Sequence, residues 1–313
     1  MSKIIADIGG TNARFALVDD AGNINNIDVL SCADYKSPGD AALTYLKRIG
    51  GQPKTGAFAV ATALDGTDAV TMTNHVWNFS INATKADIGL SSLRVVNDFA
   101  ALAYAVPYLA EKDRYQLGGG EAQKNMPIAI IGPGTGLGVA GVVFDDNGKP
   151  IVVTAEGGHV TMPADNAREF ALFEWLKNSK YHHISAERVV SGKGLVNLYH
   201  AVCGVDKLDL PELTPAEITA KALDKSCKAC VEVLDLFCHF LGVVSGNLAL
   251  SYGAKGGVYI AGGIVPQLGE YFKTSRFRES YLAKGRFSEY VGRIPTFIIT
   301  HPYPGLEGLK NIA

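Results

Sequence analysis

One short segment near the start of the chain combines residue types that suit phosphate chemistry. Asp7 ends an apolar strand pattern. The following positions include Gly9, Gly10, Thr11, Asn12 and Arg14. Glycines let the backbone approach an anion and offer it bare N–H groups. Thr11 and Asn12 add donors, and Arg14 adds a planar positive fork. The Asp7 carboxylate suits Mg²⁺ or its water shell. The segment therefore predicts a phosphate-binding turn; the alternative is a plain hairpin turn with a surface arginine.

A similar turn occurs a second time. Residues 128–148 repeat the order found in residues 4–22: strand, Gly-Thr turn, strand, then an Asp-Asp-x-Gly turn. In this copy the residues that would face a phosphate are Gly134, Thr135 and Gly136. The repeat suggests two related domains that face each other, each with its own phosphate-binding turn.

Two other nucleotide motifs fit the sequence less well. Residues 136–141 match GxGxxG, with Glu156 twenty residues further on. A dinucleotide-binding turn must open a helix, because the pyrophosphate sits at the helix N-terminus. Here residues 139–148 predict a strand and a hairpin turn instead. Residues 191–194, Ser-Gly-Lys-Gly, lack the upstream glycine and the following Ser or Thr of a Walker A motif.

The elements that must position these turns alternate between strands and helices. Apolar runs bounded by turn residues predict strands within 3–33 (three, as a meander), 56–61, 93–96, 127–132, 137–144, 149–155, 256–260 and 296–300. Helical patterns cover 38–49, 97–108 and 214–252, and a hairpin is expected within 67–80.

This order predicts an α/β chain of two domains, each with a mixed sheet that opens in a three-strand meander. We expect a small domain over residues 1–108, completed by a C-terminal helix within 301–313, and a large domain over 109–300. Residues 108–125 show no solvated linker composition, so we expect a packed hinge there.

Composition excludes several classes of function. The chain has 313 residues, 47% of them hydrophobic, and a net charge of −2, so it has no basic field for nucleic acid. Its first residues lack a signal-peptide pattern, and the apolar stretch 231–252 is interrupted by charged and polar residues, which favours a buried helix over a membrane span.

Five cysteines, an odd number, favour reduced thiols in a cytoplasmic protein. We read Cys227 and Cys230 as buried helical thiols rather than a metal or redox pair.

Taken in order, the motifs resemble those of the bacterial glucokinases of the hexokinase–actin–Hsp70 superfold. They are DxGGTNxR at 7–14, Asn-Asp at 97–98, GxGTGLG at 132–138, EGGHV at 156–160 and SAERVxSGxGLxNLY at 185–199. The resemblance runs from about residue 4 to 308. The related ROK sugar kinases have a cysteine-rich zinc cluster soon after their EGGH-like residues. No such cluster follows His159, which favours the non-ROK branch.

The resemblance implies a two-domain ribonuclease-H-like (actin/hexokinase) fold with a cleft between the domains. It implies an ATP-dependent glucokinase that phosphorylates the 6-hydroxyl of glucose, with ATP and Mg²⁺ lying across the two Gly-Thr turns and with cleft closure excluding water. Asp7 would hold Mg²⁺ through water. The resemblance also implies a homodimer that acts in glycolysis, with no nucleic-acid or membrane partner.

The resemblance assigns roles to residues outside the two turns. Asp98 would be the general base that accepts the proton of the attacking hydroxyl; the alternative is a helix cap. Sugar hydroxyls would be bound by Asn97, Asp98, Glu156, His159 and Glu187. His159 could instead be structural, and Glu187 an exposed residue at a helix start.

Four further residues match family positions. Gly262 and Gly263 match an adenosine-side turn. Asn74 and Trp77 match a stretch near the sugar, although packing is an equal explanation for the tryptophan.

Two rival functions stay open on the sequence. One is a kinase for another hexose or an amino sugar. The other is a non-catalytic sugar sensor on the same fold, which would have no need of an acceptor carboxylate such as Asp98. The phosphoryl donor also stays open among ATP, ADP and pyrophosphate, because backbone turns distinguish these poorly.

Overall fold

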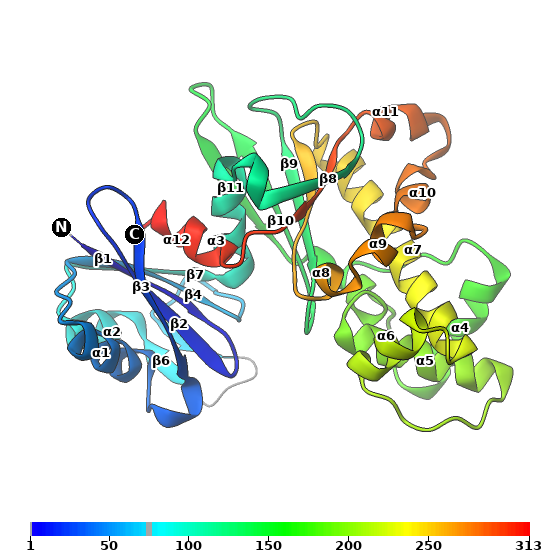
Figure 1. Cartoon of the computed structure of the whole chain (residues 1–313), viewed down its shortest axis with the longest axis horizontal. Coiled ribbons are helices and arrows are strands. Elements are labelled where there is room, and N and C mark those ends of the chain that lie inside the picture. The colour runs from blue at the N-terminus through cyan, green and yellow to red at the C-terminus, as the bar shows by residue number, and fades with distance from the viewer. Residues whose placement is uncertain (1, 73–76) are drawn as a thin grey trace. The chain divides into compact units, whose positions relative to one another are not determined.

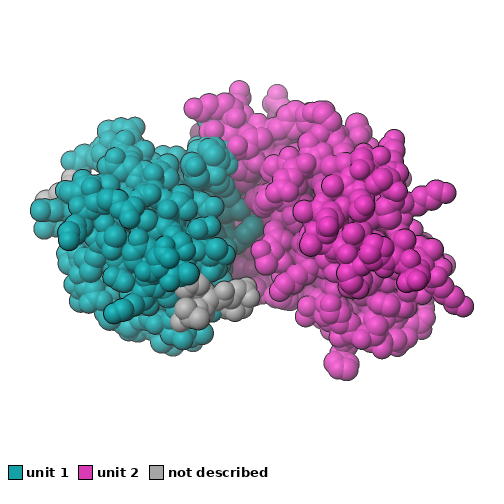
Figure 2. Space-filling view, turned by 60° about the horizontal axis from the view of Figure 1, so that its bottom comes forward, with its two compact units in different colours: residues 1–110, 301–313 teal, residues 111–300 magenta. Residues whose placement is uncertain are grey.

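The computed structural model describes residues 2–72 and 77–313 and falls into two compact units. Unit 1 comprises Met1–Ala110 and His301–Ala313, and unit 2 comprises Glu111–Thr300 (Figure 2). Each unit is built around its own sheet, and each is described by itself below.

The sheet of unit 1 has five strands in the order β3-β2-β1-β4-β7 (Figure 1). Their bounds are β1 (Lys3–Ile8), β2 (Asn12–Val18), β3 (Ile24–Ser31), β4 (Thr55–Val60) and β7 (Ser92–Asn97). The meander β1–β2–β3 is antiparallel, while β4 runs parallel to β1 and β7 parallel to β4. The sheet is therefore mixed and opens in the three-strand meander that the sequence predicts.

Helices cover both faces of this sheet. One face packs α1 (Pro38–Ile49) and α2 (Ile81–Ile88) over side chains such as Phe15 and Phe58. The opposite face packs α3 (Asp98–Ala105) and α12 (Pro304–Lys310). Because side chains alternate along a strand, each central strand must be apolar on both faces, which explains its continuous apolar sequence. Between β4 and β7 in the sequence, β5 (Ala69–Thr71) and β6 (Asn78–Ser80) pair as a small antiparallel hairpin, at the predicted position.

The C-terminal helix α12 lies against α3. Leu306 and Leu309 of α12 are fully buried with Ala101 of α3. At Gly308 a Cβ would collide with the backbone carbonyl of Ala101, so only glycine allows this approach. The last residues of the chain therefore support the helix that begins at Asp98.

The sheet of unit 2 has six strands in the order β11-β10-β9-β12-β13-β8. Their bounds are β8 (Arg114–Gly118), β9 (Ile128–Pro133), β10 (Leu137–Phe144), β11 (Pro150–Ala155), β12 (Gly257–Ile260) and β13 (Thr296–Ile299). Five strands repeat the order and directions of unit 1, and β8 is added at the edge, antiparallel to β13. The segment 108–125, for which a packed hinge is expected, contains strand β8, which the sequence does not predict. Residues 114–118 alternate between polar and apolar side chains. They form a strand only by pairing with β13, which is distant in the sequence.

The helices of unit 2 enclose one large core. Their bounds are α4 (Ala167–Ser179), α5 (Gly192–Asp206), α6 (Pro215–Leu223), α7 (Lys228–Tyr252), α8 (Ile264–Leu268), α9 (Glu270–Thr274), α10 (Phe277–Leu282) and α11 (Ser288–Gly292). α6 begins at the predicted capping box, in which Thr214 and Glu217 satisfy each other's backbone N–H groups. Residues 224–227 separate α6 from α7 within the predicted helical region.

Helix α7 is long and apolar enough to cross a membrane, since its 25 residues include a window of mean hydropathy 1.6. Of that window, 72% is buried inside the unit. Phe237, Cys238 and Leu241 are completely buried among neighbouring helices. α7 is therefore a core helix, as its interrupted apolar pattern predicts.

Candidate active site

The first Gly-Thr turn joins β1 to β2 in a compact loop. The Gly9 N–H donates to the Asn12 carbonyl at 2.9 Å, and the Thr11 carbonyl accepts from the Cys32 N–H at 2.8 Å. Thr11 and Asn12 are exposed. Among the described residues, the amides of Gly10 and Thr11 donate to no protein acceptor. Such a loop leaves donors available to an anion.

Two charged side chains flank this turn. Asp7 on β1 and Arg14 on β2 are opposite each other in register, with Arg14 Nη1 3.7 Å from Asp7 Oδ2. Burial raises the pKa of Asp7, and the Arg14 guanidinium acts against that increase. Gly305, beside the start of α12, comes so close to Asp7 that its Cβ would lie 3.5 Å from the carboxyl group. Asp7 is therefore a partly shielded carboxylate with one cation beside it.

Asn97 and Asp98 come at the same edge of the sheet as the first turn. In the parallel registers of β1, β4 and β7, Ile8 pairs with Val60, and Val60 pairs with Asn97. The three strands therefore end at one level, which places the turn and the start of α3 along one edge. Ligands of α/β sheets characteristically bind at such carboxyl ends.

Asn97, rather than Asp98, is the cap of α3. Its Oδ1 accepts from the N–H groups of Phe99 and Ala100 at 2.9 and 3.2 Å, and its Nδ2 donates to the Thr62 carbonyl at 3.1 Å. Asp98 is the first helical residue, and its Oδ1 accepts from the Phe99 N–H at 2.8 Å. Because Asn97 satisfies the capping requirement, helix capping does not explain the carboxylate of Asp98.

Asp98 has the electrostatic character of a general base. Burial and, secondly, the charge of Asp7 raise the pKa of Asp98 to about 6, although hydrogen bonds from Phe99 and Asn97 oppose this. A carboxyl group with a pKa near the working pH accepts a proton more readily than an ordinary aspartate does. A perturbed carboxyl group at a strand end is also typical of functional sites.

The second Gly-Thr turn joins β9 to β10 in unit 2. The Gly134 N–H donates to the Gly136 carbonyl at 2.8 Å, and the Gly134 carbonyl accepts from the Gly192 N–H at 2.8 Å. Thr135 is exposed at the tip. The Leu137 N–H donates to Glu187 Oε2 at 2.9 Å. Glu187 is half-buried in a 3₁₀ turn, Ala186–Arg188, and is not the exposed helix-start residue that the alternative reading offered.

Glu156 is the N-cap of another 3₁₀ turn, Gly157–His159, and His159 is its last residue. Their side chains are 71% and 61% exposed, and His159 Nε2 is 3.9 Å from Glu156 Oε2. The glycines between them lie directly on β10: a Cβ at Gly158 would collide with the Leu137 carbonyl. The two exposed side chains are therefore anchored beside the second turn and are available to a polar ligand.

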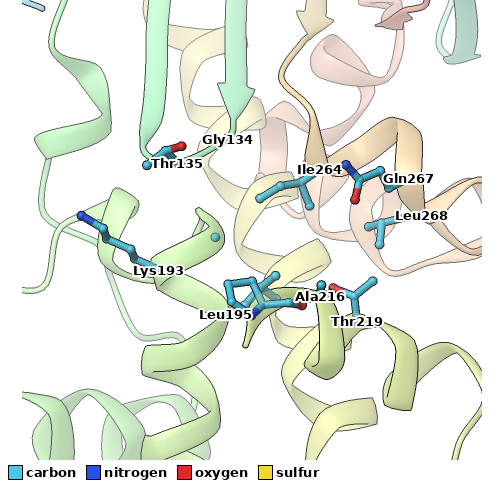
Figure 3. A pocket seen from close by; sticks show the side chains of 11 residues that line it. Gly134, Thr135, Lys193, Leu195, Ala216, Thr219, Ile264, Gln267 and Leu268 are labelled. Atoms are coloured by element: carbon cyan, nitrogen blue, oxygen red, sulfur yellow. Dashed lines mark hydrogen bonds between the residues drawn. The ribbon is translucent and has the colours of Figure 1, made fainter. Parts of the chain in front are cut away.

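A cavity of about 330 Å³ opens next to Thr135 within unit 2 (Figure 3). It is lined by Gly134, Thr135, Gly192, Lys193, Leu195, Pro215, Ala216, Thr219, Ile264, Gln267 and Leu268. Gly262 lies just before this wall with φ +83°, and its Cβ would collide with the Pro133 carbonyl, so Gly262 lets the loop pass close to the second turn. Gly263 follows as the N-cap of α8.

Sequence reasoning missed most of this cavity. In the sequence, Lys193 belongs only to an incomplete Walker A motif, yet in the structure it lines the cavity beside Thr135. Pro215 and Thr219 fall within a predicted helical range, and Gln267 belongs to no motif. The walls come from four separate segments, so no local motif marks them; spacing on α6, where Pro215 and Thr219 are four residues apart, was the one available signal.

The two remaining residues that match family positions are Trp77 and Asn74. Trp77 is 1% exposed and donates from Nε1 to the Tyr35 carbonyl at 2.9 Å, so it packs in the core of unit 1. Asn74 lies outside the described residues. Within residues 2–72 and 77–313, no three His, Cys, Asp or Glu side chains gather as metal ligands.

Comparison with known proteins gives one consistent family. The family model described as Glucokinase matches residues 4–313. The chain is 47% identical over 311 residues to a curated glucokinase of Paramagnetospirillum magneticum, covering 99% of this chain and 96% of the relative. It is 46% identical over 312 residues to the glucokinase of Nitrobacter hamburgensis, again covering 99% and 96%.

Solved structures agree with this family. A crystal structure of glucokinase from an Antarctic psychrotroph has a TM-score of 0.89 and 37% identity, covering 99% of each chain. A ROK family glucokinase from Streptomyces griseus, solved with glucose and AMPPNP, has a TM-score of 0.65 and 19% identity, covering 100% of this chain and 99% of that one, which shows a shared fold. The motifs, the paired sheets and the whole-length matches have one explanation: this chain belongs to the glucokinase family.

Proposed function

We propose that this protein transfers the γ-phosphoryl group of ATP to the 6-hydroxyl of glucose. The observation that carries this proposal is Asp98: a carboxyl group with a pKa of about 6, free of the capping role, at the carboxyl edge of a sheet in a glucokinase-family chain. A sugar hydroxyl does not attack phosphorus efficiently unless its proton has an acceptor, and Asp98 is suited to be that acceptor.

In the proposed step the sugar oxygen forms a bond to the γ-phosphorus while its proton passes to the Asp98 carboxylate. The bond between the γ-phosphorus and the bridging oxygen breaks, and ADP leaves with that oxygen. The charge spread over the transferring group is stabilised by the free amides of the first turn and by Arg14. Asp98 later returns the proton to solvent.

The proposed sugar ligands are Asn97, Asp98, Glu156, His159 and Glu187. Glu156 and His159 are exposed and anchored, as a hydroxyl-binding pair needs to be. A cluster of acceptors and donors in fixed positions distinguishes sugars by their hydroxyl pattern.

The proposed nucleotide-binding residues are those of the two Gly-Thr turns, together with the cavity of unit 2. Leu195, Ala216, Ile264 and Leu268 give the cavity apolar walls that suit a planar base (Figure 3). Thr135 and Lys193 line the part of the cavity next to the second turn, and the phosphates are proposed to bind there. Gly262 and Gly263 form the proposed turn beside adenosine. Use of ATP is supported by the fold shared with a glucokinase whose structure contains AMPPNP.

Mg²⁺ is proposed to accompany ATP. Asp7 suits it, because Mg²⁺ usually binds through one or two carboxylates together with substrate phosphates and water, and needs no cage of protein ligands. When bound, the ion would neutralise charge on the phosphates. The proposed setting is the cytoplasm, in glycolysis, as a homodimer; light scattering on the purified chain tests the dimer.

The direct test is ADP release from ATP and Mg²⁺, measured by a coupled assay with and without glucose. The expected result is release that depends on glucose, with a product whose phosphorus couples to the C6 protons in NMR. Glucose-independent release, or no release at all, would contradict the proposal.

Specificity is tested with the same assay. Glucose is expected to be the preferred acceptor in a panel that includes fructose, mannose and glucosamine, and ATP the preferred donor over ADP and pyrophosphate. A clear preference for another sugar would replace glucose in the proposal and leave the role of Asp98 intact.

A further inference from the structure

The Glu187 carboxylate is seated directly on the second Gly-Thr turn. Its Oε2 accepts the Leu137 N–H at 2.9 Å. A Cβ placed on Gly136 would lie only 2.5 Å from that same oxygen. Non-bonded carbon and oxygen atoms do not approach this closely. The Glu187 carboxylate can therefore occupy this position only because residue 136 has no side chain.

The segment that carries Glu187 is stabilised internally and makes a further hydrogen bond to the same turn. Ser191 Oγ donates to the Glu187 carbonyl at 2.8 Å, which fixes the backbone of the 3₁₀ turn. The next residue, Gly192, donates its N–H to the Gly134 carbonyl at 2.8 Å. Residues 187–192 and 134–137 therefore form one hydrogen-bonded block inside unit 2.

Only one carboxylate oxygen of Glu187 is used in this block. Among the described residues, Oε1 has no hydrogen-bond partner. A hydrogen bond to an ionised acceptor is about twice as strong as a neutral one, so the Leu137 N–H fixes the carboxylate and leaves Oε1 to a ligand. The position of the free oxygen is therefore set by the backbone of the turn.

We infer that Gly136 is a positioning residue for sugar binding. Because it has no side chain, it allows the Glu187 carboxylate to lie against the second turn. This inference rests on the proposed binding of sugar by Glu187. It assigns to a glycine of the phosphate turn an effect on the affinity for glucose.

The variant Gly136→Ala is suited to a test because the fold should tolerate it. The backbone of Gly136 is not in the left-handed region, so alanine can adopt its conformation. The atom that the new methyl group meets is the end of a flexible side chain. Glu187 can turn away at small cost, and the expected consequence is a folded protein with a displaced carboxylate.

Gly134 offers a matched control two residues away. A Cβ at Gly134 meets nothing within 4 Å, and Gly134 lines the cavity. Gly134→Ala should therefore alter nucleotide affinity and leave Glu187 in place. Gly292→Ala, on α11, serves as a remote control, because its Cβ would meet Leu282 at an ordinary 3.5 Å.

The experiment measures glucose binding by calorimetry without nucleotide, and ATP KM by the coupled assay. Gly136→Ala is expected to weaken glucose binding about tenfold, as the loss of one charged hydrogen bond does. Gly134→Ala is expected to raise the ATP KM and keep the glucose Kd. Gly292→Ala should change neither.

A double-mutant cycle tells whether Gly136 acts through Glu187. In a Glu187→Ala background, Gly136→Ala should cause no further loss of glucose affinity. Glu187→Asp is one methylene shorter and is expected to lose the hydrogen bond from Leu137, so it should also weaken glucose binding and remove the effect of Gly136→Ala. The comparison with Glu187→Asp keeps the test decisive if Gly136→Ala alone has a lowered melting temperature.

Unchanged glucose affinity in Gly136→Ala, or additive losses in the cycle, would overturn the inference. A wild-type chain that neither binds nor phosphorylates glucose would overturn the proposed function instead, so the two failures are distinguishable.

Discussion

The β1–β2 hairpin and the β9–β10 hairpin occupy the same place in their two sheets and end in the same way. Each opens at a Gly-Thr turn and leads to an Asp-Asp-x-Gly turn. There Asp19 accepts from the amides two and four residues later, at 3.0 and 2.8 Å, and Asp145 does the same at 2.9 and 2.8 Å. The far turns are equivalent even in their hydrogen bonds.

The two Gly-Thr turns differ in the origin of their charge. In the first, Asp7 and Arg14 belong to the hairpin itself and face each other across its strands. In the second hairpin, no charged residue occupies the corresponding positions. The Glu187 carboxylate accepts a hydrogen bond from the Leu137 N–H at this turn, and Lys193 lines the same cavity as Thr135. Both residues belong to a segment that is distant from the turn in the sequence.

This difference shows how one backbone plan can serve two tasks. The first turn is surrounded by partly buried carboxyl groups whose pKa values are raised, Asp7 and Asp98, which suits proton and metal chemistry. The second turn is a neutral backbone loop, and side chains from other segments supply its contacts with ligands. The following predictions test this division, beginning with the largest effect.

Asp98→Asn should lower kcat by about a thousandfold, within the usual range for loss of a general base. The amide keeps the size and the hydrogen bond to Phe99 but accepts no proton. Glucose binding, measured by calorimetry, should stay within a few-fold of the wild type. A kcat near the wild-type value would remove Asp98 from the chemistry and weaken the contrast between the two turns.

Asp7→Asn should lower kcat by about a hundredfold and also shift its pH dependence. In the wild type, kcat/KM for glucose should fall as pH decreases through about 6, where Asp98 takes up its proton. The negative charge of Asp7 helps to raise the pKa of Asp98, so its removal should move this acid limb to lower pH. Thr135→Val, in the second turn, should leave the limb in place. An identical acid limb in wild type and Asp7→Asn would disprove the coupling.

Lys193→Gln should raise the ATP KM about five- to tenfold and leave kcat and the glucose KM unchanged. The reason is loss of one charged contact with phosphate at the side of the cavity, and about 1.4 kcal/mol corresponds to tenfold. Lys47→Gln on α1 is the matched surface control. An unchanged ATP KM would mean that the second turn binds phosphate without a cation.

The smallest predicted effect is on stability. Because the pKa of Asp98 is raised in the folded state, folding favours its protonated form; stability from this group is complete below pH about 4 and is lost as pH rises through about 6. Asp98→Asn should therefore be more stable than wild type by about 1 kcal/mol at pH 7.5, allowing for partial exposure. Urea unfolding at pH 5 and pH 7.5 measures this; a difference that does not grow with pH would contradict the raised pKa.

Much of the fold could be predicted from local sequence. The strands around both Gly-Thr turns, the helix after Ser37 and the capping box at Thr214 lie where expected, because apolar runs and caps act over a few residues. No strand is predicted at β8, because its residues form a strand only against β13, and local propensity carries no information about such distant pairing.

The candidate site likewise combines features that follow from local sequence with features that depend on the fold. The family, the two turns and the carboxylates at strand ends can be predicted from the sequence, since each depends on residue types at short spacing. The folded structure is needed to show that Asn97 caps α3, that burial and Asp7 raise the pKa of Asp98, and that the Glu187 carboxylate lies against Gly136. Burial, charge proximity and steric room depend on residues that are distant in the chain, and so they exist only once the chain has folded.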